Sequence, residues 1–152
     1  MTSLFKFGAT LACALAMQAP VQAADHGTAA EATAMVKKAI EYIKTHGKDK
    51  AYAEINKPKG MFHDRDLYVF VYDQKGVTQA HGANPKMLGK NLMELKDADG
   101  VLIVKSFLEI ANSKGRGWVD YKWPNPVSKA IESKSTYVEK HEDVVVGAGI
   151  YK

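Results

Sequence analysis

The sequence predicts an α+β fold in which one long N-terminal helix packs on a five-stranded antiparallel sheet. Three observations lead to this class. Apolar residues recur at helical spacing between residues 28 and 47, β-branched and aromatic residues crowd residues 67–81, and three further strand-like runs follow residue 116. Helices and strands that are segregated along the chain, with turn residues between consecutive strands, favour an antiparallel sheet covered by helix.

The first 23 residues have the pattern of a secretory signal peptide. Lys6 precedes an uncharged apolar run, and the sequence VQA, which ends at Ala23, places small residues where a signal peptidase reads them. A membrane anchor is the alternative, but the apolar run is short for a hydrocarbon core of about 30 Å. We therefore expect cleavage after Ala23, which leaves residues 24–152 as one exported domain in the periplasm.

The composition is that of a soluble globular protein with a single core. Apolar residues make up 46% and charged residues 25% of the 152 residues, which suffices for one domain without disulfides. The one cysteine, Cys13, lies in the predicted signal peptide, so no thiol chemistry is expected of the exported chain. The formal charge of +4 is small and the basic residues are scattered, which argues against a nucleic-acid partner.

The exported chain is predicted to begin with a long amphipathic helix. Thr28 and Glu31 form a capping-box pattern at its start, and apolar residues then recur at i, i+3 and i+4 spacing. Gly47 is a typical stop for this helix. Residues 48–56 predict a second, shorter helical segment.

The middle of the chain predicts a β-hairpin, a loop and a helix. The hairpin pairs Leu67–Asp73, which is rich in β-branched and aromatic residues, with residues 76–81. A loop with at most a short helical turn follows. Helical spacing of apolar residues resumes at Val101, and Gly115 ends that helix.

The C-terminal part predicts three more strands. They cover residues 117–122, residues 135–141 and Val144–Tyr151, and the last two form a second hairpin. With the first hairpin they make five antiparallel strands. We expect the long first helix to cover one face of this sheet and loops to cover the other.

The sequence contains no evident catalytic or metal-binding constellation. It lacks a phosphate-binding glycine loop and a nucleophile elbow. His63, beside Asp64 and Asp66, allows a metal or acid–base interpretation, although a solvated turn before the first strand is the simpler one. No two histidines have the spacing of a zinc site. An enzyme is therefore the least favoured function, and we expect neither a metal nor a cofactor.

Aromatic and cationic residues, by contrast, gather around one part of the predicted sheet. A small carboxylate needs cations and hydrogen-bond donors for its charge and apolar walls for its alkyl part. We predict such a ligand between the sheet and the loops at residues 84–91 and 123–126, with the charge offset by a lysine and a histidine. The residues expected to line this site are His81, Lys90, Trp118, Tyr121, Trp123 and Tyr137.

Trp118 does not fit this site without a further assumption. Strict alternation along the third strand places Trp118 on the opposite face from Tyr121 and Trp123. All three share one pocket only if the strand is bulged or if Trp118 lies at the pocket rim. Taken singly, each of these aromatic residues is better explained by core packing.

Several of these segments together resemble the single Cache domain, in particular its second subtype. They are DLYVFVYDQKGVTQAHGANPKMLGKN, KDADG, GRGWVDYKWPNP, KSTYVEK and DVVVGAGIY, and their order and spacing agree from about Phe62 to Tyr151. The resemblance implies a PAS-like Cache fold and an extracytoplasmic sensor that binds small molecules, often short organic acids, and is not an enzyme. The six site residues named above fall in the stretches that shape the family's pocket.

The resemblance also implies a signalling context. Domains of this family usually belong to chemoreceptors and histidine kinases. This chain ends at Lys152, soon after the last predicted strand, so we expect it to act through a membrane receptor or kinase partner and not to span the membrane once the signal peptide is cleaved. A homodimer through the N-terminal helix is the assembly that the resemblance suggests.

Two functions of different classes stay open at this point. The first is a periplasmic sensor module for short-chain carboxylates that acts in chemotaxis-related signal transduction. The second is a protein-binding adaptor with a vestigial pocket. A pocket filled by side chains, or a large apolar patch on the first helix, would favour the adaptor.

Export is the first testable prediction. We expect the mature protein to start at Ala24 and to occur in the periplasmic fraction, because a charged start, an apolar run and a cleavage sequence follow in that order. N-terminal sequencing of protein from that fraction checks this. Met1 retained on protein from the membrane fraction would instead identify the segment as an anchor.

Overall fold

The structure, a computed structural model, describes residues 26–152. The predicted signal peptide lies outside the described residues. None of the helices within residues 26–152 has both the length and the apolar character needed to cross a membrane. The helical elements are α1 (Ala29–His46), α2 (Lys48–Ile55), the short 3₁₀ helix η1 (Pro85–Met87) and α3 (Ile103–Lys114). The strands are β1 (His63–Asp64), β2 (Leu67–Asp73), β3 (Thr78–His81), β4 (Arg116–Pro124), β5 (Ile131–His141) and β6 (Val144–Tyr151).

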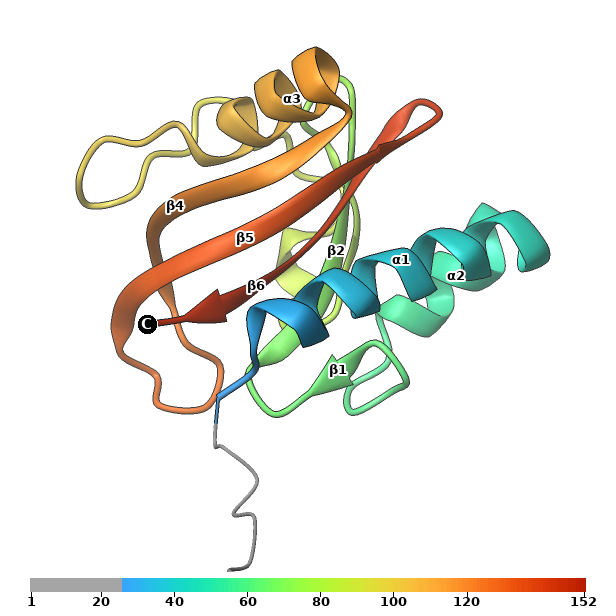
Figure 1. Ribbon diagram of the computed structural model, residues 1–152, viewed down its shortest axis with the longest axis horizontal. Helices are drawn as coiled ribbons and strands as arrows, with labels where there is room; N and C mark the ends of the chain where they lie inside the picture. Colours follow the sequence, from blue (N-terminus) through green and yellow to red (C-terminus); the bar gives the residue numbers. More distant parts are fainter. Residues whose placement is uncertain (1–25) are drawn as a thin grey trace, which may run out of the picture.

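An antiparallel sheet forms the centre of the molecule (Figure 1). Its order is β1-β2-β6-β5-β4, and β3 also pairs with β2. The predicted α+β class is confirmed, but the sheet has six strands within residues 26–152 and not five. The added strand is β1, whose two residues pair with the start of β2. A segment this short carries no periodicity that sequence reasoning can detect.

The strand boundaries follow the prediction closely for β2 and β6 and differ for the other strands. β4 and β5 are longer than expected because their ladder continues through Lys122↔Ser133 to Pro124↔Ile131. β3 begins at Thr78, two residues later than predicted. The carboxylate of Asp73 accepts hydrogen bonds from the amides of Lys75 and Val77, 2.9 Å each, and so holds those residues in the turn.

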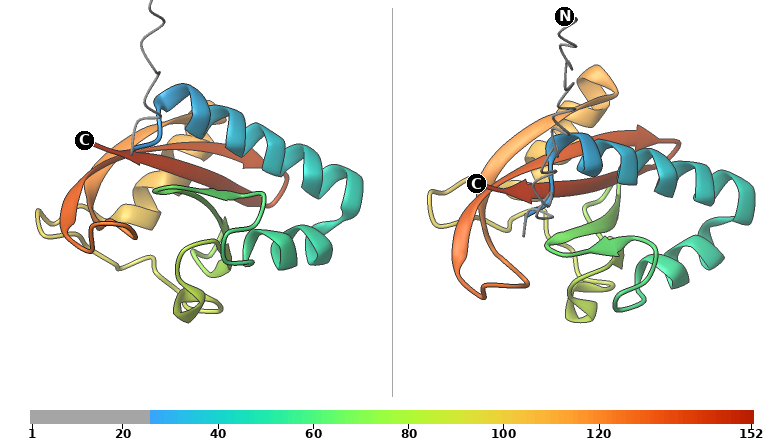
Figure 2. Two further views of the ribbon diagram at one scale, coloured as in Figure 1. Left: turned by 90° about the horizontal axis from the view of Figure 1, so that it is seen from below. Right: turned by 60° about the horizontal axis from the view of Figure 1, so that its bottom comes forward.

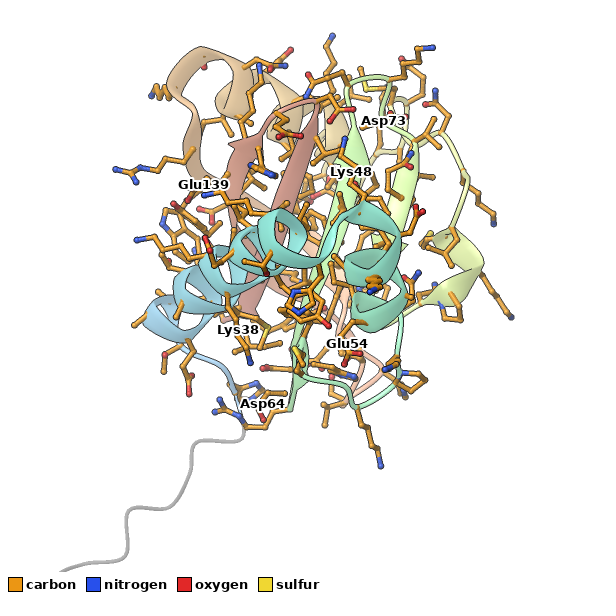
Figure 3. The ribbon with its side chains drawn as sticks, turned by 90° about the vertical axis from the view of Figure 1, so that its right-hand side faces the viewer. Lys38, Lys48, Glu54, Asp64, Asp73 and Glu139 are labelled. Carbon is orange, nitrogen blue, oxygen red and sulfur yellow. The ribbon has the colours of Figure 1, made fainter. Side chains whose placement is uncertain are left out.

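The two faces of the sheet carry separate apolar layers. Helices α1 and α2 cover one face (Figure 3), and α3 with the segment after β3 covers the other (Figure 2). The first six residues of β2 are all buried because both faces are covered. Alternation sends Val69 and Val71 toward α1, whereas Phe70 and Tyr72 face α3. Sequence reasoning had found the helix that became α3 but expected only loops on that face.

The start of α1 is fastened to the sheet by a buried carboxylate. Asp66, fully buried just before β2, accepts hydrogen bonds from the Gly27 amide at 2.7 Å and from His26 Nδ1 at 2.8 Å. The predicted capping box is present, with both the Thr28 and Glu31 side chains bonded to backbone amides. The sequence had suggested a solvated turn or a metal site around Asp66. The structure instead uses this residue to position the first helix.

Candidate functional site

The face of the sheet under α3 contains two adjacent cavities. The inner cavity lies between α3 and the sheet and has a volume of about 10 Å³, which is room for about one water molecule. The outer pocket has a volume of about 310 Å³, within the range of small-ligand sites. Tyr68, His81 and Trp123 line both. The outer pocket is bounded by segments 83–87 and 124–129, which is where the sequence predicted a ligand.

Beneath these cavities lies a fully buried ammonium group, that of Lys134 on β5. Its Nζ donates hydrogen bonds to the hydroxyl oxygens of Tyr68 at 2.8 Å and Tyr151 at 3.1 Å. It also lies 4.0 Å and 4.5 Å from the centroids of the same two rings, a cation–π arrangement. No carboxylate of residues 26–152 forms an ion pair with it. Burial lowers the pKa of Lys134 well below its ordinary value, although the more distant Asp66 opposes that shift.

The neighbouring strand is shaped to accommodate this lysine. Gly149 on β6 lies where an added Cβ would be 2.8 Å from Lys134 Cε and 2.1 Å from Thr136 Oγ1. A side chain at position 149 would therefore displace both groups. Thr136 is fixed in turn by a 2.9 Å hydrogen bond with the Tyr121 hydroxyl. Gly149, in the C-terminal motif, thus leaves the space in which the Lys134 side chain lies over the neighbouring strand β6.

The polar network continues from Lys134 to the outer pocket. The Tyr151 hydroxyl accepts from Lys134 and donates its own proton to the Pro124 carbonyl at 2.9 Å. Tyr68 accepts from Lys134 in the same way, and its hydroxyl lies 3.5 Å from that of Tyr151, a long contact from which the Tyr68 O–H can turn to a nearer acceptor. Burial raises the pKa of both tyrosines, which keeps the phenols neutral and able to donate.

His81 occupies the wall shared by the two cavities and is 4% exposed. Its Nδ1 accepts hydrogen bonds from the amides of Asn84 at 3.1 Å and Ala83 at 3.3 Å, so in the neutral ring the proton is on Nε2. Burial, reinforced by the charge of Lys134, lowers the pKa of His81 to about 3. His81 is therefore a neutral donor at physiological pH, and not the cation that the sequence suggested.

The far wall of the outer pocket is a loop organised by a buried asparagine. Asn125 is 1% exposed, and its Oδ1 accepts from the Val127 amide at 2.8 Å while its Nδ2 donates to Glu132 at 2.8 Å. This loop brings Lys129 to the pocket wall, where its Nζ donates to the Pro126 carbonyl at 2.5 Å. An exposed cation thus stands at the pocket and a buried one beneath it.

The six residues predicted for the site divide between the two faces of the sheet. His81, Tyr121 and Trp123 meet under α3. Trp118 and Tyr137 pack against each other, with ring centroids 5.5 Å apart, and Tyr137 belongs to the apolar layer under α1. No bulge interrupts β4, whose ladder with β5 is regular from Arg116 to Pro124. Strict alternation therefore holds, and Trp118 faces away from the pocket.

Lys90 also lies away from both cavities. Its side chain is exposed, and it lines neither the inner cavity nor the outer pocket. The backbone carbonyl of Lys90 has a structural role, because it accepts hydrogen bonds from the Thr78 amide at 2.9 Å and from the Thr78 hydroxyl at 3.3 Å. Neither Lys90 nor the Trp118–Tyr137 pair can therefore reach a ligand held in the pocket as it stands.

Sequence reasoning missed three residues that the structure brings to this site. Tyr68 and Lys129 line the outer pocket, and Lys134 is bonded to Tyr68 behind it; none of the three is among the six predicted residues. The available signal was alternation. Lys134 has the parity of Thr136 and the opposite parity to Tyr137, so it shares the face opposite Tyr137.

The model of the single Cache domain 2 family matches residues 8–152. The chain belongs to this family. The resemblance read from the motifs is thereby confirmed, and the PAS-like Cache fold is the one observed. The domain is therefore related to sensory domains of chemoreceptors and sensor kinases, which are not catalytic units.

Individual relatives agree with this Cache assignment. Methyl-accepting chemotaxis protein McpP of Pseudomonas putida is 27% identical over 95 residues, which cover 61% of this chain and 18% of that protein. Sensor histidine kinase MctS of Rhizobium johnstonii is 32% identical over 91 residues, covering 59% and 20% respectively. The chain spans about a fifth of the length of these relatives.

A solved structure is similar over most of the domain. It was described as the structural basis for carboxylic acid recognition by a Cache chemosensory domain, and it superposes with a TM-score of 0.68 at 26% identity. The match covers 80% of this chain and 91% of that one.

Acid titration of stability tests the environment of His81. The folded protein keeps His81 neutral down to pH about 3, whereas the unfolded chain protonates it below about pH 6.5. Protons are therefore taken up on unfolding, and the stability present above pH 6.5 is lost as pH falls toward 3. We expect the free energy of unfolding to fall by up to about 1.4 kcal/mol per pH unit in this window because of His81 alone.

The matched variant is His81→Asn, whose amide oxygen can accept the same backbone bonds without titrating. Urea unfolding at several pH values should show a shallower pH dependence for His81→Asn than for wild type. The difference between the two slopes isolates the contribution of His81. Parallel curves for wild type and His81→Asn would contradict the buried, neutral state.

Proposed function

We propose that this Cache domain is a periplasmic sensor module that binds a small organic acid in the pocket under α3. The observation that carries the proposal is the amino group of Lys134, which is buried without a carboxylate partner beneath the pocket wall and whose pKa burial lowers. A buried cation is costly unless an anion compensates it. A ligand carboxylate near Tyr68 would supply that charge, and the carboxylic acid recognition described for a similar Cache structure is consistent with it.

The remaining groups of the pocket suit a short acid. Tyr68 and His81 can each donate one hydrogen bond from a neutral O–H or N–H. Trp123 and the pocket-lining segment 83–87 supply apolar surface for a short alkyl chain. Lys129 adds an exposed cation that favours the approach of anions. The combination selects for a small monocarboxylate over an amine, which the two cations would repel.

The ligand signal is proposed to pass to a membrane receptor or a kinase. This follows from the relatives, in which similar segments form part of a chemotaxis protein and a sensor kinase. The adaptor hypothesis has one observation in its favour, since the inner cavity is nearly filled by side chains. The same ligand titration separates the two, because an adaptor with a vestigial pocket binds no acid.

Removal of the buried cation gives the first test of this function. Calorimetric titration of the wild type with acetate, propionate, pyruvate and lactate should identify at least one ligand. We expect Lys134→Met to weaken that binding about tenfold to a hundredfold, because a charge-assisted contact contributes roughly 1.5–3 kcal/mol. Met has a similar length and no charge, so the fold should be retained or stabilised.

Lys90→Met is the matched control, since it removes the same charge from an exposed site outside the pocket. It should leave the affinity within about twofold of wild type. Equal effects of the two substitutions would show that only net charge matters. Binding of amines or amino acids in place of every acid would refute the carboxylate assignment and leave the sensor fold intact.

The pH dependence of binding gives a second test. Burial lowers the pKa of Lys134 in the free protein, and a bound carboxylate raises it again by favouring the charged form. Between these two pKa values, binding takes up a proton, so affinity should fall as pH rises. Calorimetry in two buffers of different ionisation enthalpy measures this uptake directly. Lys134→Arg keeps a permanent cation and should bind without proton uptake; uptake that persists in this variant would assign the proton to another group.

A further inference from the structure

The border strand β4 presents an unpaired edge (Figure 1). β4 is the last strand in the sheet order and, within residues 26–152, pairs only with β5. The amide of Lys122 donates to Asp97 Oδ2 at 2.8 Å, and Asp97 belongs to the segment before α3 and not to β5. Residues of the same parity point their backbone N–H and C=O groups in the same direction. The backbone groups of Arg116, Trp118 and Asp120 therefore point outward, away from β5.

This edge is covered at one end and free at the other. Asp97 closes it at Lys122, and its other carboxylate oxygen accepts from the amides of Asp99 and Val101. From Arg116 to Asp120, the part of the chain that the structure describes provides no backbone partner on the outer side. The side chains of residues 116, 118 and 120 are all exposed, and Trp118 is 38% exposed.

Open space flanks the free edge on both faces of the sheet. On the α3 face a shallow, open surface depression lies beside β4 and is bordered by Ile110 and neighbouring residues of α3. On the α1 face a second shallow depression lies between Trp118 and the small residues Ala30 and Ala34. An added strand and its side chains therefore have room beside β4.

The charges along this edge are self-complementary about Trp118, and Asp120 also forms an ion pair with Lys152 of its own chain at 3.1 Å. Arg116 lies two residues before the tryptophan and Asp120 two residues after it. When two copies of β4 pair antiparallel with a twofold axis at Trp118, Arg116 of each copy lies opposite Asp120 of the other, on the same face. The outward-pointing backbone groups are the ones that this register pairs, and they form about six hydrogen bonds.

We propose that this protein forms a homodimer through its β4 edges, with Trp118 at the twofold axis. The two sheets join into one continuous sheet, and each Trp118 contributes its exposed ring to the depression beside the partner's ring. Two Arg116–Asp120 pairs fix the register, and a shift by two residues along the edge would break both. The interface goes beyond ligand sensing and uses a surface different from α1, through which a Cache dimer was expected from the resemblance.

Two substitutions and their combination test this assembly. Arg116→Asp places two acidic groups opposite each other twice in the dimer, and Asp120→Arg does the same with basic groups. Each single variant should raise the dimer Kd at least about tenfold, because like charges directly opposite on paired strands repel. The double variant Arg116→Asp/Asp120→Arg restores both opposite-charge pairs and should return to within about threefold of the wild-type Kd.

Sedimentation velocity of the wild type and variants, over micromolar to millimolar protein, measures these constants. Lys50→Asp on the exposed side of α2 changes the net charge as Arg116→Asp does and should leave the Kd unchanged. Circular dichroism and thermal melting confirm that each variant is folded, and Trp118→Asp, which removes the central ring contact, should also weaken the dimer. A wild type that is monomeric throughout overturns the proposal. So does a dimer that neither single variant weakens, since that dimer forms through another surface such as α1.

Discussion

A single buried ammonium group sets most of the requirements that the surrounding structure meets. The Lys134 ammonium lies against the rings of Tyr68 and Tyr151, and both hydroxyl oxygens accept hydrogen bonds from it. An ammonium can be buried only where its donors are satisfied. Two tyrosines from different strands, Tyr68 and Tyr151, meet this condition, and Gly149 leaves room for the alkyl part of the Lys134 side chain. The outer pocket lies against this arrangement because Tyr68 serves both.

The fold was largely predictable because its signals are local. The period of α1 and its capping box lie within a few residues of one another, and the strand Leu67–Asp73 is defined by its own composition. β1 escaped detection because two residues have no period, and β3 was misplaced because its turn depends on the side chain of Asp73. Both errors concern local features, a two-residue strand and a side-chain-stabilised turn, that leave no periodic pattern of apolar residues in the sequence.

The site was only partly predictable because it depends on contacts between residues far apart in sequence. His81, Tyr121 and Trp123 were found since aromatic and imidazole groups in motif segments are conspicuous. Lys134 is not among the predicted residues; a lysine in a strand ordinarily faces solvent, and its partner Tyr68 is 66 residues away. Lys90 was preferred for the opposite reason, as a lysine in a loop near the pocket, and the structure places its side chain in solvent. Register across the sheet, and not residue type, decides which lysine contacts Tyr68 in the pocket wall.

The alternation of β4 assigns two roles to one strand. Its odd positions, Tyr121 and Trp123, face the cavities under α3, whereas the even positions Trp118 and Asp120 carry the free edge. The two proposals therefore share a backbone but no side chain. If ligand binding alters the twist or the order of β4, it changes the free energy of edge pairing, and linkage requires pairing to change ligand affinity by the same factor. If both proposals hold, β4 links the pocket wall to the dimer edge, so occupancy of one domain can be communicated to a second copy through this strand.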